Sequence, residues 1–326
     1  MRRLLLLVLL VVGLTIPAAC GGGDDLAAFA FPTVSSGEPG VDPKVISSTA
    51  PPTETVIQVL HEGTGQPIAA HDVLVADAKA QVWSTGGVEL PSFLNTFSGG
   101  RLLFRAIDQT VPGWGKVLPG IKVGSRVLMV TPPVDGFGPE GNPQVGIGKD
   151  DTLIWVVDIV DAVPVDAVAT GTPGKALPNA AALPTVTAGK NPTITVPKAA
   201  APKKLVAEPL LVGQGAKVAK GQTILAQYTG TIWRDGSVFD TSWKPDRGPF
   251  NARIAETDQK TGEPGVIKGW VDGLAGQRVG SRILLVVPPN LGYQKAGNPQ
   301  AGITGTDTLV FVVDILGAYG DPAAPS

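Results

Sequence analysis

The pattern of apolar and polar positions indicates mostly short strands, with one short helix among them. In the second half of the chain, apolar residues alternate with small or polar ones in "TILAQYTGTIW", "RILLVVPP" and "TLVFVVDIL", as is typical of strands. Turn residues such as Asp235-Gly236 and Gly297-Asn298-Pro299 separate these runs. Between residues 266 and 276, apolar side chains recur at spacings of 1, 3, 1 and 3, which places them on one face of a helix. The pattern predicts an α+β fold in which a curved antiparallel sheet wraps over one short helix.

The same pattern occurs twice along the chain. "VGSRILLVVPPNLGYQKAGNP" at 279–299 matches "VGSRVLMVTPPVDGFGPEGNP" at 123–143 in 12 of 21 positions. The match continues at the same offset of 156 in "TDTLVFVVDILGA" and "DDTLIWVVDIVDA". Upstream the offset is 150, where Trp233 pairs with Trp83. Each repeated unit is about 110 residues long, which is enough for a domain, so the sequence predicts two tandem domains.

The segments outside the repeats have a different composition. The stretch between the copies is rich in Pro, Ala, Gly and Thr, which is typical of a linker. A similar leader precedes the first copy, and the strand propensity of "TITV" in the second leader favours an additional edge strand. The predicted boundaries are a signal peptide at 1–19, a flexible tether at 20–52, a first domain at 53–163, a linker at 164–204, a second domain at 205–320 and a tail at 321–326.

The N-terminus has the layout of a secretory signal. Two arginines precede an apolar run from Leu4 to Ile16, which is too short to span a bilayer. The sole cysteine, Cys20, follows small residues and resembles the acylated cysteine of a bacterial lipobox, although Pro17 stands where that motif usually has Leu. The resemblance implies an extracytoplasmic protein held at the cell membrane by lipid on Cys20. The alternative is an ordinary cleaved signal.

Composition excludes several classes of function. The net charge is −2 without any basic block, which argues against a nucleic-acid partner. With Cys20 assigned to lipidation, no thiol remains for a disulfide or a nucleophile. The two histidines, His61 and His71, are interpreted as surface residues, and "GIGKDDT" lacks the residues of a phosphate-binding loop. We therefore expect neither a metal nor a cofactor.

An ordered set of motifs in the second copy resembles the FKBP-type peptidyl-prolyl cis-trans isomerases. The motifs are "YTG", "DGSVFDTS", "GPF", "VIKGW", "VGSR", "GY" and "TLVFVVDIL", spread in one register over roughly residues 205 to 318. The resemblance implies a site in which Tyr228, Asp240 and Tyr293 are catalytic. It implies a substrate-binding surface made of Phe239, Phe250, Val266, Ile267, Trp270, Ile303 and Phe311. Taken singly, Phe239, Phe250 and Phe311 would be interpreted as core residues, Asp240 as a solvated turn carboxylate and Tyr293 as a surface loop residue.

The first copy departs from this motif set. Ala78 stands at the position of Tyr228, Phe137 at that of Tyr293, and Leu90 or Leu94 at that of Asp240, depending on where the gap is placed. We expect the first domain to keep the scaffold and to lose most or all isomerase activity, leaving it as a binding surface for unfolded chain or as a spacer.

The resemblance implies a prolyl isomerase that assists the folding of secreted, proline-containing proteins and that macrolide-type inhibitors can bind. The main alternative is a chaperone or cell-envelope binding module without catalysis, built on the same scaffold. A small-molecule binder that uses the same pocket is a third interpretation.

Overall fold

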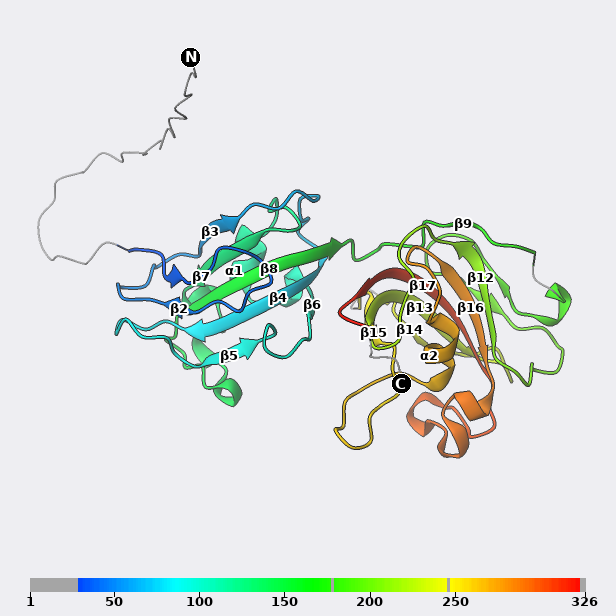
Figure 1. Ribbon diagram of the computed structural model, residues 1–326. Helices are drawn as coiled ribbons and strands as arrows, with labels where there is room; N and C mark the ends of the chain where they lie inside the picture. Colours follow the sequence, from blue (N-terminus) through cyan, green and yellow to red (C-terminus); the bar gives the residue numbers. More distant parts are fainter. Residues whose placement is uncertain (1–28, 177–178, 245–246, 323–326) are drawn as a thin grey trace, which may run out of the picture.

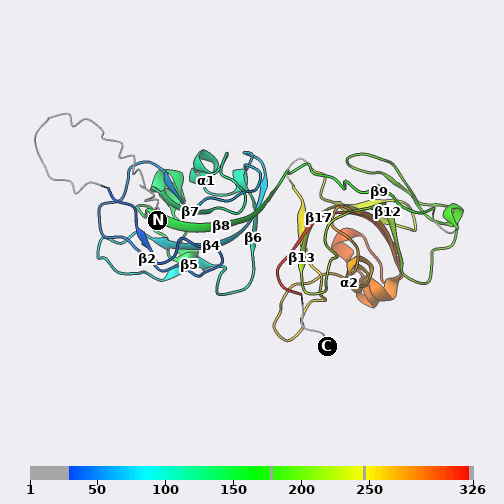
Figure 2. The ribbon, with the colours of Figure 1, turned by 45° about the horizontal axis from the view of Figure 1, so that its top comes forward.

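The computed structural model describes residues 29–176, 179–244 and 247–322, and it contains two domains side by side (Figures 1 and 2). Within these residues, no helix has the length and apolar character needed to cross a membrane. The predicted signal segment and Cys20 lie outside the described residues.

Each domain is built on one antiparallel sheet with the same strand order. In the first domain the order is β3-β7-β8-β4-β5, with β6 also paired to β4. The strands are β3 (Val56–His61), β4 (Val73–Val82), β5 (Ser92–Asn95), β6 (Leu103–Ala106), β7 (Arg126–Thr131) and β8 (Leu153–Val163).

The second sheet repeats this arrangement and adds one strand. Its order is β14-β13-β17-β16-β12-β9, with β15 also paired to β13. The strands are β9 (Thr172–Pro173), β12 (Val206–Val212), β13 (Thr223–Ile232), β14 (Val238–Thr241), β15 (Phe250–Arg253), β16 (Arg282–Val287) and β17 (Leu309–Tyr319). The prediction of an α+β fold with two tandem domains is confirmed.

One short helix lies against the concave face of each sheet. These helices are α1 (Pro112–Val117) and α2 (Lys268–Leu274). The second begins later than the apolar spacing predicts, because Ile267 has an extended backbone with ψ of 147°. Gly269 lets this helix approach β16 closely, since a Cβ there would lie 2.4 Å from Val287 Cγ1. The helix thereby presents Trp270, Val271 and Leu274 to the core.

The leader segments cover the opposite face of each sheet. In the first leader, β1 (Thr33–Val34) pairs with β2 (Val45–Ile46), and in the second, β10 (Thr185–Val186) pairs with β11 (Ile194–Thr195). The indole N–H of Trp83 donates to Thr49 O at 2.9 Å, and the indole N–H of Trp233 donates to Ala199 O at 3.1 Å. Each domain therefore has three layers: helix, sheet and leader hairpin.

A buried ion pair in each sheet fixes its leader hairpin. Arg126 donates to both carboxylate oxygens of Asp158, and it also donates to Ser36 O at 3.0 Å and Val41 O at 2.8 Å. In the second domain, the corresponding pair is Arg282 with Asp314, and Arg282 donates to Gly189 O at 2.8 Å. Because a buried guanidinium needs hydrogen-bond partners beyond its carboxylate, the leader carbonyls supply further acceptors to each pair.

These observations differ from the predicted tether and linker. Residues 29–52, expected to be flexible, pack on the first sheet, and residues 179–204 pack on the second. "TITV" forms part of the hairpin rather than an edge strand, and the added edge strand is β9, which pairs with β12. The physical reason is that strands such as β7 and β16 are buried along their whole length, so both faces of each sheet need a cover.

Candidate functional site

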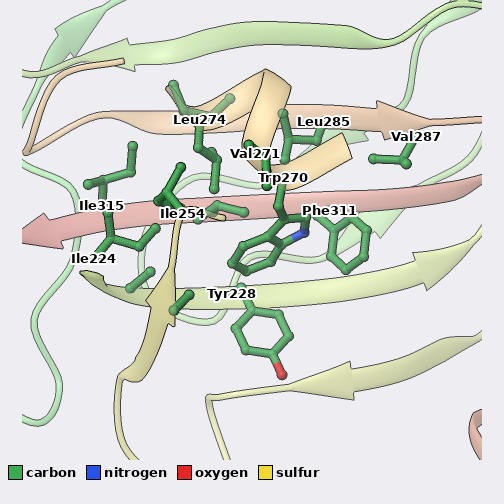
Figure 3. Packing of buried hydrophobic residues seen from close by; sticks show 14 of the residues in the cluster. Ile224, Tyr228, Ile254, Trp270, Val271, Leu274, Leu285, Val287, Phe311 and Ile315 are labelled. Atoms are coloured by element: carbon green, nitrogen blue, oxygen red, sulfur yellow. The ribbon is translucent and has the colours of Figure 1, made fainter. Parts of the chain in front are cut away.

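An aromatic cluster on the helix side of the second sheet forms the base of the site. Trp270 is 4% exposed, and its ring meets those of Tyr228 and Phe311 edge to face, with centroids 5.5 and 5.4 Å apart. Figure 3 shows Trp270 between α2 and the sheet, with the hydroxyl of Tyr228 directed away from the indole. Perpendicular packing fixes the orientation of each ring, so the floor of the site is rigid.

Two phenylalanines form walls around this floor. Phe239 on β14 packs edge to face on Phe311 at 5.6 Å, and Phe250 on β15 packs on Tyr228 at 5.7 Å. Gly230 on the neighbouring strand makes room for Phe239, because a Cβ there would lie 2.6 Å from Phe239 Cζ. Phe250 remains 42% exposed, a large apolar surface left open to solvent beside the floor.

The polar part of the site is a chain of three side chains. The hydroxyl of Tyr228 donates to Asp240 Oδ2, and Arg247 Nη1 donates to Asp240 Oδ1 at 2.8 Å. The backbone N–H of Thr241 also donates to Asp240 Oδ1, at 2.9 Å. Burial, and then the hydrogen bond to Asp240, raise the pKa of Tyr228 well above its ordinary value, so the hydroxyl stays protonated at neutral pH.

Arg247 and Ser242 belong to this site although sequence reasoning missed both. Arg247 pairs with Asp240 from the loop before β15. Ser242 Oγ accepts the N–H of Tyr228 at 2.8 Å and donates to Gln227 Oε1 at 2.5 Å, which ties the end of β14 to β13. Ser242 is the last residue of the motif "DGSVFDTS", of which only the aromatic and acidic positions are predicted as site residues, whereas the only signal for Arg247 in the sequence is its nearness to Asp240.

The remaining predicted residues come from loops at the two ends of the cluster. Val266 N–H donates to Ala255 O at 2.8 Å, which holds the segment before α2. The N–H of the next residue, Ile267, makes no backbone hydrogen bond among the described residues. Tyr293 lies between the 3-10 turns Pro289–Leu291 and Gln294–Ala296. A backbone donor and a hydroxyl are thus available from two separate loops.

These side chains enclose one cavity of about 900 Å³, which we call the aromatic cleft. Nine of the ten predicted site residues line it: Tyr228, Phe239, Asp240, Phe250, Val266, Ile267, Trp270, Tyr293 and Phe311. Ile303, expected at the rim, is instead 3% exposed and packs in the core. Two backbone hydrogen bonds, at 2.9 and 3.0 Å, pair it with Asn298 and hold it away from the cleft.

The first domain has the same strand arrangement, but different side chains stand at the positions of the site. The register pairs Leu94 with Ala80 and Asp240 with Gly230, so Leu94, rather than Leu90, occupies the position of the acid. Trp114 packs edge to face on Trp155 at 5.4 Å. Leu94 and Phe137 pack against the hydrophobic core there, so the polar groups of the cleft have apolar replacements.

Both repeats match one known protein family. The family model for the FKBP-type peptidyl-prolyl cis-trans isomerases matches residues 71–160 and 214–316. A probable FK506-binding protein of Corynebacterium glutamicum is 35% identical over 40% of this chain and 99% of its own length. The Escherichia coli isomerase FkpA is 38% identical over 37% of this chain and 40% of its own length. The crystal structure of the three FKBP domains of wheat FKBP73 aligns with 82% of this chain and 95% of its own, at 19% identity and a TM-score of 0.31, which is too loose for a further comparison.

Proposed function

The chain belongs to the family of FKBP-type peptidyl-prolyl cis-trans isomerases, and on that premise we propose that its second domain carries the isomerase activity while the first has little or none. The observation that carries the proposal is the chain of hydrogen bonds from Tyr228 through Asp240 to Arg247 at the wall of an aromatic cleft. In the first domain, Ala78 and Leu94 stand at the positions of the first two residues.

The reaction needs a site that destabilises a planar amide. Rotation about the peptide C–N bond has a barrier of about 18 to 20 kcal/mol, which comes from amide resonance. Resonance separates charge, so an apolar surface such as the face of Trp270 stabilises the twisted amide relative to the planar one. In this proposal the substrate proline lies over Trp270, between Phe239 and Phe250.

Three polar groups then hold the twisted form. The free N–H of Ile267 and the hydroxyl of Tyr293 donate to substrate carbonyls on either side of the rotating bond. Asp240, held by Tyr228 and Arg247, places negative charge near the imide. A thousandfold acceleration requires only about 4 kcal/mol of such differential stabilisation, which a few hydrogen bonds can supply.

We expect the substrates to be proline-containing segments of proteins that fold outside the cytoplasm. The cleft is also large enough for a macrolide-type inhibitor. Both expectations rest on the family resemblance and on the secretory signal pattern of the N-terminus. A non-catalytic binding module would need the aromatic floor but not the aligned hydroxyl, carboxylate and guanidinium.

A pair of equivalent substitutions tests the assignment in the full chain. Asp240→Ala and Leu94→Ala change the same structural position in the two domains. In a protease-coupled assay with a proline tetrapeptide, we expect Asp240→Ala to lower kcat/KM by about tenfold and Leu94→Ala to leave it within twofold. Equal losses in the two variants, or an intact protein without activity, would refute the proposal.

We further propose that lipid on Cys20 anchors the protein to the outer face of the cell membrane. The support is the sequence alone: a short apolar run, small residues and a single cysteine. In membrane fractionation, the unaltered chain is expected in the pellet and Cys20→Ser in the soluble fraction. Equal partition of the two forms would contradict the anchor.

A further inference from the structure

A second cavity lies between the two domains and adjoins the aromatic cleft. It has a volume of about 520 Å³ and shares four lining residues with the cleft: Phe250, Asn251, Gly265 and Val266. The first domain borders both cavities, through Gly99 to Leu102 and Phe104 in this interdomain groove and through Gln109 in the cleft. The two cavities are therefore neighbours that meet at these four residues.

Edge strands line both sides of the interdomain groove. β6 pairs only with β4, and β15 pairs only with β13, so each has one unpaired edge among the described strands. Phe104 of β6 and the whole of β15 line the groove, and Figures 1 and 2 show the first-domain strand β6 on the side that faces the second domain. Unpaired strand edges offer backbone donors and acceptors to an extended peptide.

The charged groups in the groove also suit a polypeptide backbone. Arg101 and Arg253 share the carboxylate of Glu263, at 2.6 and 3.3 Å, and Asp321 lines the same groove. The site thus offers donors and acceptors together, with an exposed guanidinium at Arg101. A peptide backbone carries both kinds of group in alternation, whereas a nucleic acid would require an excess of positive charge.

The walls of the groove are held at a fixed spacing by a packed interface. Val73 and Val163 of the first domain cluster with Leu225 of the second. Tyr319 packs edge to face on Phe104 at 5.7 Å, and its hydroxyl donates to Asp161 Oδ2 at 2.7 Å. A preformed groove costs less ordering on binding than one assembled by the ligand.

We propose that the interdomain groove binds, in extended conformation, the polypeptide segment that flanks the substrate proline. The first domain then contributes recognition to a reaction whose chemistry it does not perform. The inference rests on the proposed isomerase function of the cleft, since the proline there sets where the flanking chain begins. Because an extended chain spans about 3.3 Å per residue, we expect residues beyond the tetrapeptide core to be the ones that reach the first-domain side of the groove, at Gly99 to Leu102 and Phe104.

The test compares peptide lengths in the full chain. The substrates are a proline tetrapeptide and two twelve-residue peptides, one extended before the proline and the other after it. Arg101→Glu reverses the exposed charge of the groove, and Leu102→Trp fills it. The matched control is Arg105→Glu, an exposed residue of β6 that does not line either cavity.

We expect at least one long peptide to have a kcat/KM about tenfold above that of the tetrapeptide. Arg101→Glu and Leu102→Trp should remove most of the difference in kcat/KM between the long peptide and the tetrapeptide, without changing the kcat/KM of the tetrapeptide. The control Arg105→Glu should leave that difference unchanged. Equal rates for all peptide lengths, or variants that affect all lengths alike, would overturn the inference. If no peptide is isomerised, the proposed function fails instead. Fluorescence titration with the labelled long peptides then decides whether the groove variants weaken binding.

Discussion

Three polar positions distinguish the two domains at the scale of single residues. Where the second domain has two tyrosines and an acid, the first has Ala78, Leu94 and Phe137. All three replacements are apolar side chains that lie in or pack against the first core. A hydroxyl or carboxylate buried without partners costs free energy, so under the proposed loss of activity the first domain would gain stability by exchanging such groups for apolar ones.

Tyr228→Phe tests whether the hydroxyl of this residue orients Asp240. The change removes one donor to the carboxylate and leaves those of Arg247 and Thr241 in place. Because a hydrogen bond to a charged group contributes about 1.5 to 3 kcal/mol, we expect kcat/KM for a tetrapeptide to fall by about tenfold. The midpoint of urea unfolding followed by tryptophan fluorescence controls for folding. Unchanged kcat/KM in a folded variant would show that the hydroxyl has no part in the reaction.

The sequence predicts most residues of the cleft and misses those that act through others. Trp270 and the aromatic walls belong to recognisable strands and a helix, so their place follows from the fold. Arg247 reaches Asp240 from a loop, and loop geometry has no periodic pattern in the sequence. The predicted place of Ile303 at the rim differs from the structure for the same reason, because two backbone hydrogen bonds with Asn298 set the position of Ile303 in its loop.

At the scale of elements, the leader hairpins are the feature that the sequence least reveals. Their strands are two residues long, which is too short for alternation to show. An indirect signal exists in the sheet beneath, because β7 and β16 contain an arginine among uninterrupted apolar residues. A strand without polar alternation is buried on both faces, and its arginine needs partners that only a covering segment can supply.

Arg126→Ala tests the role of the buried pair in holding the first leader. Arg126 is fully buried and Asp158 is 6% exposed at the side chain, and loss of one partner of a buried pair costs about 3 to 5 kcal/mol. We expect a decrease of that size in the free energy of urea unfolding of the first domain. Limited proteolysis should then cut within residues 35 to 44, whose carbonyls the guanidinium holds.

A double variant, Arg126→Leu with Asp158→Leu, serves as the control for an unpaired charge. The double variant should recover part of the lost free energy of unfolding, because it leaves no isolated carboxylate. The protease should still cut it within the leader, because the leader carbonyls have lost their donor. If Arg126→Ala costs under about 1 kcal/mol, the pair does not fix the hairpin.

At the scale of the whole molecule, the two domains meet at an interface that contains a partly buried tyrosine. Tyr319, near the end of β17, joins the aromatic ring of Phe104 and the carboxylate of Asp161 in the first domain. The tandem repeat predicts two domains from the sequence, but the contacts between them depend on side chains that the two copies do not share, such as Asp161, where the second copy has Gly317. Tyr319 follows directly on the last matched residue, Ala318.

Alkaline pH tests this interface. Burial, and then the hydrogen bond to Asp161, raise the pKa of Tyr319 above its ordinary value of about 10. A raised pKa means that the contribution to stability is complete below pH 10 and is lost as the pH rises further. We therefore expect the thermal unfolding midpoint to fall above pH 10, and to fall less in Tyr319→Phe. An identical decline in both proteins would contradict the assigned role.

The most direct test of the central claim, that only one of the two copies is catalytic, is the isomerase activity of the full chain with its second cleft disabled. Asp240→Ala combined with Trp270→Ala removes the acid and the floor of that cleft and leaves the first domain unaltered. The account predicts that kcat/KM for a proline tetrapeptide falls by at least about a hundredfold, equal to roughly 2.7 kcal/mol of transition-state stabilisation. A double variant that is folded and retains more than about half of the original kcat/KM would place the activity in the first domain and contradict the account.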